Sequence, residues 1–278
     1  IHFEKKKIIK EYLPDYSDKI IFKDTKIKFT KTKPTNVIEL NGFIEKNNKF
    51  DSFTLEQTYN FEKRSYSVLG KADLTNSEVN ISKLNYNKDI GKKAEIDFNF
   101  NFKPNKYLNL KKISFLSEET KIGIADLKLN RSFEVNDFKK IKIKTFKNGN
   151  KNNDFLAEKS KKIKVSGEIF DSEPLLKSLF RKDERKIFSK KFNSDIKINF
   201  EKVISGSNDD VKNFGMIATI KKGSYEKLSL KGNFTENEII EMSIYQVEKD
   251  KKTLQVISDR ARPFIKNFNF IKGFEDGK

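Results

Sequence analysis

The feature that most constrains the fold is a regular alternation of apolar and polar residues that recurs along most of the chain. Successive side chains of a β-strand point to opposite faces, so a period of two predicts strands with one apolar face and one wet face. Burial of a single face is typical of antiparallel sheets. Two segments show the pattern most clearly: 95–103, with Ile96, Phe98, Phe100 and Phe102, and 195–203, with Ile196, Ile198 and Phe200.

The same alternation predicts further strands along the chain. Short turns rich in Asn, Gly and Lys, such as Lys222-Gly223-Ser224, separate neighbouring strands and are typical of hairpins. The predicted fold class is therefore mainly β, an elongated, twisted antiparallel sheet. The further predicted strands are 26–30, 37–45, 50–61, 65–75, 78–84, 108–115, 121–129, 133–146, 161–169, 214–221, 226–234, 239–248 and 253–257.

Two short amphipathic helices are predicted where the alternation stops, at 171–181 and 258–270. The first has Asp171 or Ser172 as its cap, Pro174 in its first turn, and an apolar side formed by Leu175, Leu176, Leu179 and Phe180. The second has Ser258 or Asp259 as its cap and an apolar side formed by Ala261, Phe264, Ile265 and Phe268. Each helix follows a strand, so each is expected to cover a sheet edge or the end of a groove.

The least regular stretch, 148–162, is rich in Lys and Asn and is predicted to be a long loop. It suggests a boundary between two β segments. The predicted organisation is a connector at 1–17, a first β segment at 18–150, a linker at 151–162 and a second β segment with both helices at 163–278. Because the sequence starts at Ile1, we expect it to be part of a longer protein.

Residues that usually carry catalysis or bind metals are scarce. The chain has no Cys and one His, His2, which leaves no catalytic triad, no thiolate site and no multi-His zinc site. No glycine motif that would cradle phosphates is present. Nothing distinguishes a pair of carboxylates among the 40 acidic residues. We therefore expect no enzyme activity, no cofactor and no metal.

The formal net charge of +18 suggests a nucleic acid or an anionic membrane surface as a partner. However, nearly all the basic residues are Lys, and Asn, Ile and Phe are also abundant, as an AT-rich genome would produce. Proteins that read nucleic-acid sequence favour Arg, whose planar group makes paired hydrogen bonds. We expect no specific nucleic-acid partner.

The apolar faces of the strands have two possible uses. They can pack a closed core, or part of them can line a groove for acyl chains, because each methylene removed from water contributes about 0.8 kcal/mol. An outer-membrane β-barrel would also show alternating strands. The alternation alone gives as candidate lipid-binding residues Phe98, Phe100, Ile196, Ile198 and Phe200.

Two motifs resemble AsmA-like proteins of the DUF3971 (YhdP) type. The first is VSGEIFDSEPLLKSLF at 165–180, where a strand ends in an Asp that leads into a short Leu-rich helix. The second is LQVISDRARPFIKNFNFIKGFEDGK at 254–278, a strand, Ser-Asp, a short helix and a glycine turn. The family-motif residues are Gly167, Asp171, Pro174, Leu175, Leu176, Ser258, Asp259, Phe264 and Gly273. Arg260, Arg262 and Pro263 depart from the family pattern.

The resemblance implies a non-enzymatic periplasmic segment of a cell-envelope protein that a missing N-terminal helix tethers to the inner membrane. Such relatives form long β structures with a lipid-lined groove and are implicated in phospholipid transport between the inner and outer membranes. The implied partners are phospholipid or another acyl lipid, the membrane through regions outside this segment, and envelope proteins. Alternatives are an assembly module for outer-membrane proteins, an outer-membrane barrel and a basic nucleic-acid-binding protein.

Overall fold

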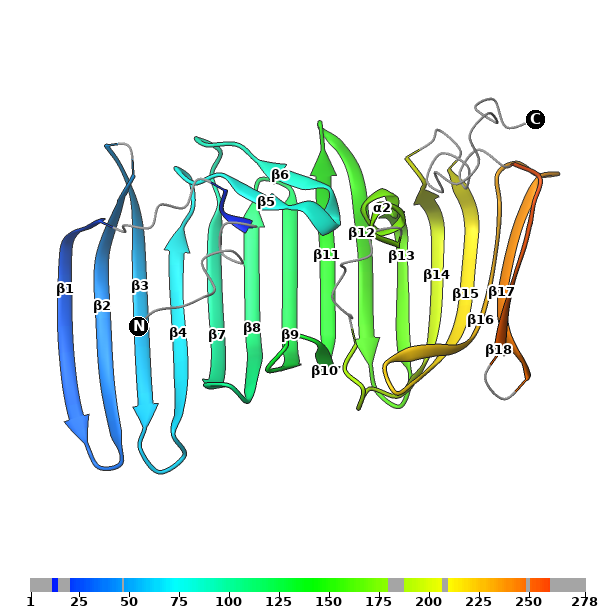
Figure 1. Ribbon diagram of the computed structural model, residues 1–278. Helices are drawn as coiled ribbons and strands as arrows, with labels where there is room; N and C mark the ends of the chain where they lie inside the picture. The colour runs from blue at the N-terminus through cyan, green and yellow to red at the C-terminus, as the bar shows by residue number, and fades with distance from the viewer. Residues whose placement is uncertain are drawn as a thin grey trace.

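The computed structural model describes residues 12–14, 21–46, 48–179, 188–206, 210–248 and 251–260. Most of them belong to one open, twisted sheet whose strands stand side by side (Figure 1). In sheet order the strands are β1 (Ile21–Thr32), β2 (Thr35–Lys46), β3 (Lys49–Asn60), β4 (Ser65–Asp73), β7 (Glu95–Lys103), β8 (Tyr107–Ser117), β9 (Thr120–Asn130), β11 (Lys140–Lys147), β12 (Asn150–Lys159), β13 (Ile163–Asp171), β14 (Ser194–Ile204), β15 (Val211–Lys221), β16 (Ser224–Asn233), β17 (Ile239–Glu248) and β18 (Lys251–Ser258). The short strand β10 (Val135–Asp137) pairs with β9.

The mainly β fold predicted from the alternation is confirmed. Neighbouring strands are antiparallel with one exception, because β13 and β14 run parallel. The chain between these two strands includes helix α2 (Glu173–Leu179) and returns to the lower end of the sheet, where Phe188 bridges to Val135. A parallel pair needs such a crossover, whereas antiparallel neighbours need only a turn.

Two predicted strands are broken in the structure. The segment predicted at 78–84 is strand β5 (Val79–Ile81) followed by the 3-10 helix η1 (Ser82–Leu84). It pairs with β6 (Tyr86–Lys88) in a separate small sheet rather than joining the large one. The segment predicted at 133–146 divides into β10 and β11.

The loop predicted at 148–162, and with it the linker at 151–162, is wrong. Most of it is strand β12, which pairs with β11 on one side and β13 on the other, so the sheet is continuous through the predicted boundary. The alternation is obscured there because Asn152 and Asn153 are buried polar residues. The Asn152 amide donates to the backbone oxygen of Leu84 at 3.0 Å, and Asn153 donates to Thr145 Oγ1 at 3.0 Å.

The first predicted helix is confirmed in its described part, as α2. Asp171 Oδ1 accepts the backbone N–H of Glu173 at 3.1 Å, as expected of a capping side chain, and Pro174 lies in the first turn. Of the second predicted helix only the start is described: Ser258 ends β18, and Asp259 and Arg260 follow it. Phe264 and Gly273 lie outside the described residues.

Candidate functional site

The strand register assembles one continuous apolar face. A row of directly paired residues crosses the whole sheet near the middle of the strands and contains no polar side chain. We call it the central row: Ile27, Leu40, Leu55, Gly70, Phe98, Ile113, Ile124, Ile141, Ala157, Val165, Ile198, Met216, Leu230, Met242 and Val256.

The opposite face is mainly polar. The neighbouring row on that side consists of Lys28, Glu39, Glu56, Leu69, Asn99, Lys112, Ala125, Lys140, Glu158, Lys164, Lys197, Ile217, Ser229, Ser243 and Gln255. Several of its lysines are neutralised across the strands, as in Lys28–Glu39 at 2.7 Å and Lys112–Asp97 at 2.6 Å. The two faces of the sheet therefore differ in character. The polar face is suited to contact with water, and the other face is suited to contact with apolar groups.

The apolar face is covered at its upper end by residues 74–94, which we call the flap and which contain β5, η1 and β6. The flap crosses the upper parts of the neighbouring strands (Figure 1). Its residues Val79 and Tyr86 are buried against Phe115, Ile122 and Ile143 of the large sheet. These contacts remove large apolar side chains from water and hold the flap in place.

Two more packed clusters cover other parts of this face. Near the lower end of β13–β15, Phe192 packs against Ile196 and Ile220. Near the upper end of β14–β17, Phe234 packs against Phe200 and Ile240. On these strands the central row lies between the two clusters, and its residues Val165 and Ile198 pack partly against both.

The central row itself is not sealed. In the central row only Gly70 and Ala157 are fully buried, and all the other residues keep part of their surface exposed. Exposure is greatest on the first strand, where Ile27 is 69% exposed and its neighbour on the same face, Phe29, is 59% exposed. A packed core would bury such residues, so this part of the face is a shallow apolar trough and not the interior of a domain.

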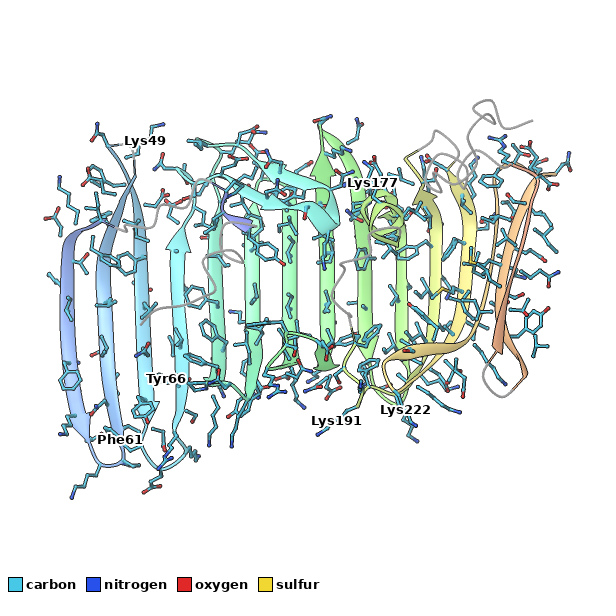
Figure 2. The ribbon with its side chains drawn as sticks, viewed as in Figure 1. Lys49, Phe61, Tyr66, Lys177, Lys191 and Lys222 are labelled. Carbon is cyan, nitrogen blue, oxygen red and sulfur yellow. The ribbon has the colours of Figure 1, made fainter. Side chains whose placement is uncertain are left out.

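Aromatic side chains extend the trough toward the lower ends of β3, β4 and β7. The ring centroids of Phe98 and Phe100 are 5.8 Å apart, and those of Phe100 and Phe102 are 6.2 Å apart. Tyr66 stacks on Phe102 at 4.8 Å and meets Tyr59 at 4.7 Å. Figure 2 shows Tyr66 and Phe61 at the lower end of the sheet.

The candidate lipid-binding residues divide into two groups. Phe98 and Ile198 lie on the central row, and Phe100 lies next to it, all three half-buried. Ile196 and Phe200 are instead fully buried in the packed clusters. All five residues share a face, but β8, β9, β11, β12 and β13 separate Phe98 and Phe100 on β7 from the three residues on β14. Sequence reasoning did not single out Ile27 and Phe29. The alternation places them on the apolar face, but it does not show which part of that face other segments, such as the flap, cover.

One family-motif residue, Asp171, links the flap to β12 and to the start of α2. Asp171 is buried, and its Oδ2 accepts hydrogen bonds from the amides of Asn85 at 2.9 Å and Asn152 at 3.3 Å. Asn85 also donates to Glu173 at 3.0 Å. Although burial opposes it, the hydrogen bond from Lys177 lowers the pKa of Glu173, so this carboxylate stays charged. Leu176 is half-buried, and Leu175 is exposed. Asp171 thus has a structural role.

Gly167 is required by close packing, and Gly167→Ala is expected to destabilise the protein by about 1–3 kcal/mol. A Cβ there would overlap the carbonyl oxygen of Asp154 and lie 2.6 Å from Phe155 Cβ. Urea denaturation measures the loss. Gly123→Ala is the matched control, since nothing lies within 4 Å of a Cβ at that position. Equal stability of the two variants would contradict the packing argument.

The two ends of the sheet differ in charge. In the described connections at the upper end, acidic residues outnumber basic ones: Glu78, Asp89, Glu118, Glu119, Glu173, Asp210, Glu236, Glu238 and Asp259 against Lys83, Lys88, Lys92, Lys93, Lys177 and Arg260. The described connections at the lower end contain only Glu62 and Glu134 as acids. Their basic residues, which we call the basic rim, are all exposed: Lys33, Lys63, Arg64, Lys106, Arg131, Lys139, Lys161, Lys162, Lys190, Lys191 and Lys222.

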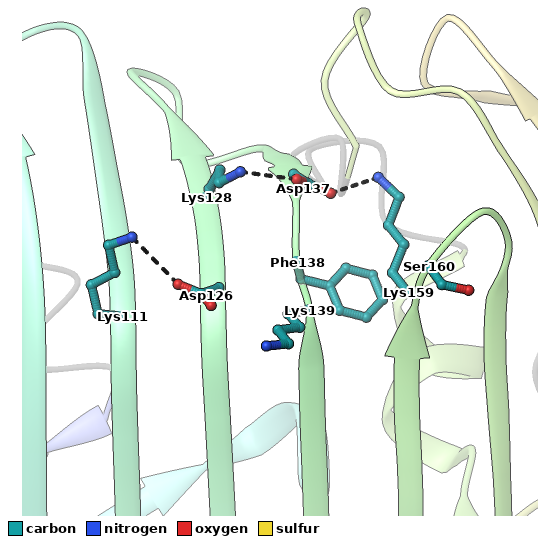
Figure 3. Close-up of a pocket in the computed structure, with 8 residues that line it drawn as sticks. All are labelled: Lys111, Asp126, Lys128, Asp137, Phe138, Lys139, Lys159 and Ser160. Carbon is teal, nitrogen blue, oxygen red and sulfur yellow. Dashed lines mark hydrogen bonds and ion pairs between the residues drawn. The ribbon is translucent and has the colours of Figure 1, made fainter.

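A hollow of about 390 Å³ on the polar face lies next to the basic rim, and Lys139 of the rim is among the residues that line it (Figure 3). Lys128 and Lys159 both hydrogen-bond the carboxylate of Asp137, at 3.1 and 2.7 Å. Burial opposes ionisation of Asp137, but these two hydrogen bonds lower its pKa. Lys111 pairs with Asp126 at 3.4 Å. The charges in this hollow mostly satisfy one another, so it is a structural ion-pair network.

Other kinds of site are not evident in the described part of the chain. No group of three or more His, Asp or Glu side chains there could hold a metal ion. No helix there has the length and apolar character needed to cross a membrane.

Comparisons with protein-family models, with curated proteins and with solved structures find no significant match to this chain. The resemblance to AsmA-like proteins therefore stays a prediction, based on the two motifs.

Proposed function

We propose that this protein is a non-enzymatic lipid-binding segment whose trough holds acyl chains against the central row. The observation that carries the proposal is the central row, which is apolar on every strand and yet remains partly exposed along nearly its whole length. Soluble proteins rarely leave an extended apolar surface open to water unless it binds something.

Acyl chains suit this surface in shape and energy. A chain of ~16 carbons gains roughly 10 kcal/mol when its methylenes leave water. The row offers aliphatic and aromatic contacts without polar groups that would need partners, so a flexible chain can lie in any register along it. The polar face keeps the sheet soluble during this contact.

We place the segment in the cell envelope, as part of an AsmA-like protein of the periplasm that is tethered to the inner membrane and aids phospholipid transport to the outer membrane. This placement is supported by the two sequence motifs and by the open, elongated, one-sided sheet. An assembly module for envelope proteins is the alternative if the trough takes a protein segment.

Native mass spectrometry of the purified protein tests the proposal. We expect co-purifying lipid, and we expect its occupancy to fall about tenfold or more in a variant with Leu40→Asp and Ile198→Asp, because each change puts a charge on the central row. Circular dichroism checks that the variant folds. A second variant, Ile27→Asp, changes a side chain that is already 69% exposed, so the fold should tolerate it.

The matched control makes the same two replacements on the polar face, Leu69→Asp and Ile217→Asp. Both residues are exposed, Ile217 by 63%. The control should keep its lipid. A wild-type protein that carries no lipid and takes up no fluorescent fatty acid would contradict the proposal and favour a protein ligand for the trough.

A further inference from the structure

We infer that the basic rim docks the lower end of the sheet onto an anionic lipid surface, with the strands upright on the membrane. This inference does not depend on the trough holding acyl chains, because the rim is formed by turns and not by the central row. It names a second interaction surface and its partner.

The first argument is that, in the part of the chain that the structure describes, the rim charges with one exception have no acidic partner. Among the described residues, Lys162 is the one member of the rim with a carboxylate within 4.0 Å, namely Asp195. Some lysines on the strands are neutralised, since Lys112, Lys128 and Lys140 each pair with an acid on a neighbouring strand. A genome bias toward Lys explains the number of lysines, but it does not explain why the described connections at this end contain so few acids beside them.

The second argument concerns repulsion within the rim. Successive turns at this end are two strands apart, which is about 10 Å. This spacing is close to the screening length at physiological salt, so the exposed cations repel one another along the edge. An array of phosphate groups relieves that repulsion, and each basic residue near an anionic membrane strengthens binding about fivefold.

The third argument selects lipid over other anions. Aromatic side chains lie at the same end: Phe61 and Tyr107 are exposed, and Tyr66 on β4 lies near Phe61 (Figure 2). Aromatic residues next to basic ones are typical of proteins that rest at a membrane interface. The aromatic extension of the trough also opens toward this end, so docking would bring it next to the lipid.

Co-sedimentation of the intact chain with vesicles tests the inference. We expect binding to vesicles of equimolar phosphatidylglycerol and phosphatidylcholine, little binding to pure phosphatidylcholine, and loss of binding at high salt. A rim variant with Lys106→Gln, Lys161→Gln and Lys191→Gln should bind the anionic vesicles about 100-fold more weakly.

The matched control removes three exposed lysines from the upper end, through Lys83→Gln, Lys92→Gln and Lys93→Gln, and so has the same net charge. It should bind within about twofold of the wild type if the rim alone docks. Equal loss in both variants would overturn the inference in favour of general charge attraction. Tighter binding to duplex DNA than to anionic vesicles would overturn it in favour of a nucleic-acid partner. Lipid occupancy in the trough, measured separately, reports on the proposed function and not on the rim.

Discussion

Phe200→Ala is expected to lower the free energy of unfolding by about 3–5 kcal/mol, the range for removing a buried Phe from a packed core. Phe200 is 6% exposed. Its ring stacks on Phe170 at 5.3 Å and meets the edge of Phe155 at 5.9 Å. Alanine would leave a cavity between β13 and β14, where the parallel pair has no turn to hold it together. Urea denaturation followed by circular dichroism measures the change.

Phe29→Ala is the matched control for Phe200→Ala, because the same atoms are removed from the same face of the sheet. Phe29 is 59% exposed, so its loss should cost less than about 1 kcal/mol. Lipid occupancy should fall more in Phe29→Ala than in Phe200→Ala, although the loss of stability is larger in Phe200→Ala. If both variants lose several kcal/mol, the whole apolar face is a packed core and the trough does not exist.

The difference in burial between Phe200 and Phe29 cannot be predicted from the alternation alone. The period of two correctly places Phe98, Ile198 and Phe200 on one face, because the direction of a side chain in a strand is a local property. Whether a residue on that face is sealed depends on the flap and on Phe192 and Phe234, which lie in the connections between strands and not in the strand that carries the residue. No local pattern distinguishes the buried Phe200 from the half-exposed Phe98.

Strand β12 was missed for a related reason. Buried polar residues look like loop residues unless their partners are known, and the partners of Asn152 and Asn153 lie in the flap and on β11 and β13. Likewise, the net charge of +18 can be counted from the sequence, but the difference in charge between the two ends of the sheet cannot. Only the meander shows that alternate turns, and hence the lysines of the basic rim, meet at one end.

Lys88→Met is expected to open the flap, at a cost of about 3–5 kcal/mol, the range for breaking a buried charged group's interactions. Lys88 is 1% exposed. Its ammonium group donates to the backbone oxygens of Leu74 at 2.7 Å, Thr75 at 3.2 Å and Ser77 at 2.6 Å. Methionine fills similar space but donates no hydrogen bond, so three carbonyl groups would be left without this donor in a site with little access to water.

The opening should be local, because the large sheet has its own hydrogen bonds and clusters. Hydrogen exchange is therefore the informative measurement: amides of β5 and β6 should lose protection, while those of β8 and β9 in the sheet keep theirs. Lys92→Met is the control, since Lys92 lies in the same flap but is exposed, with Asp89 3.6 Å away, and such a pair contributes less than about 1 kcal/mol. Unchanged protection of β5 and β6 in Lys88→Met would show that the apolar contacts of Val79 and Tyr86 hold the flap without help. If the amides of β5 and β6 lose protection in Lys88→Met and this variant also takes up more lipid than the wild type, the flap limits how far the trough extends toward the upper end.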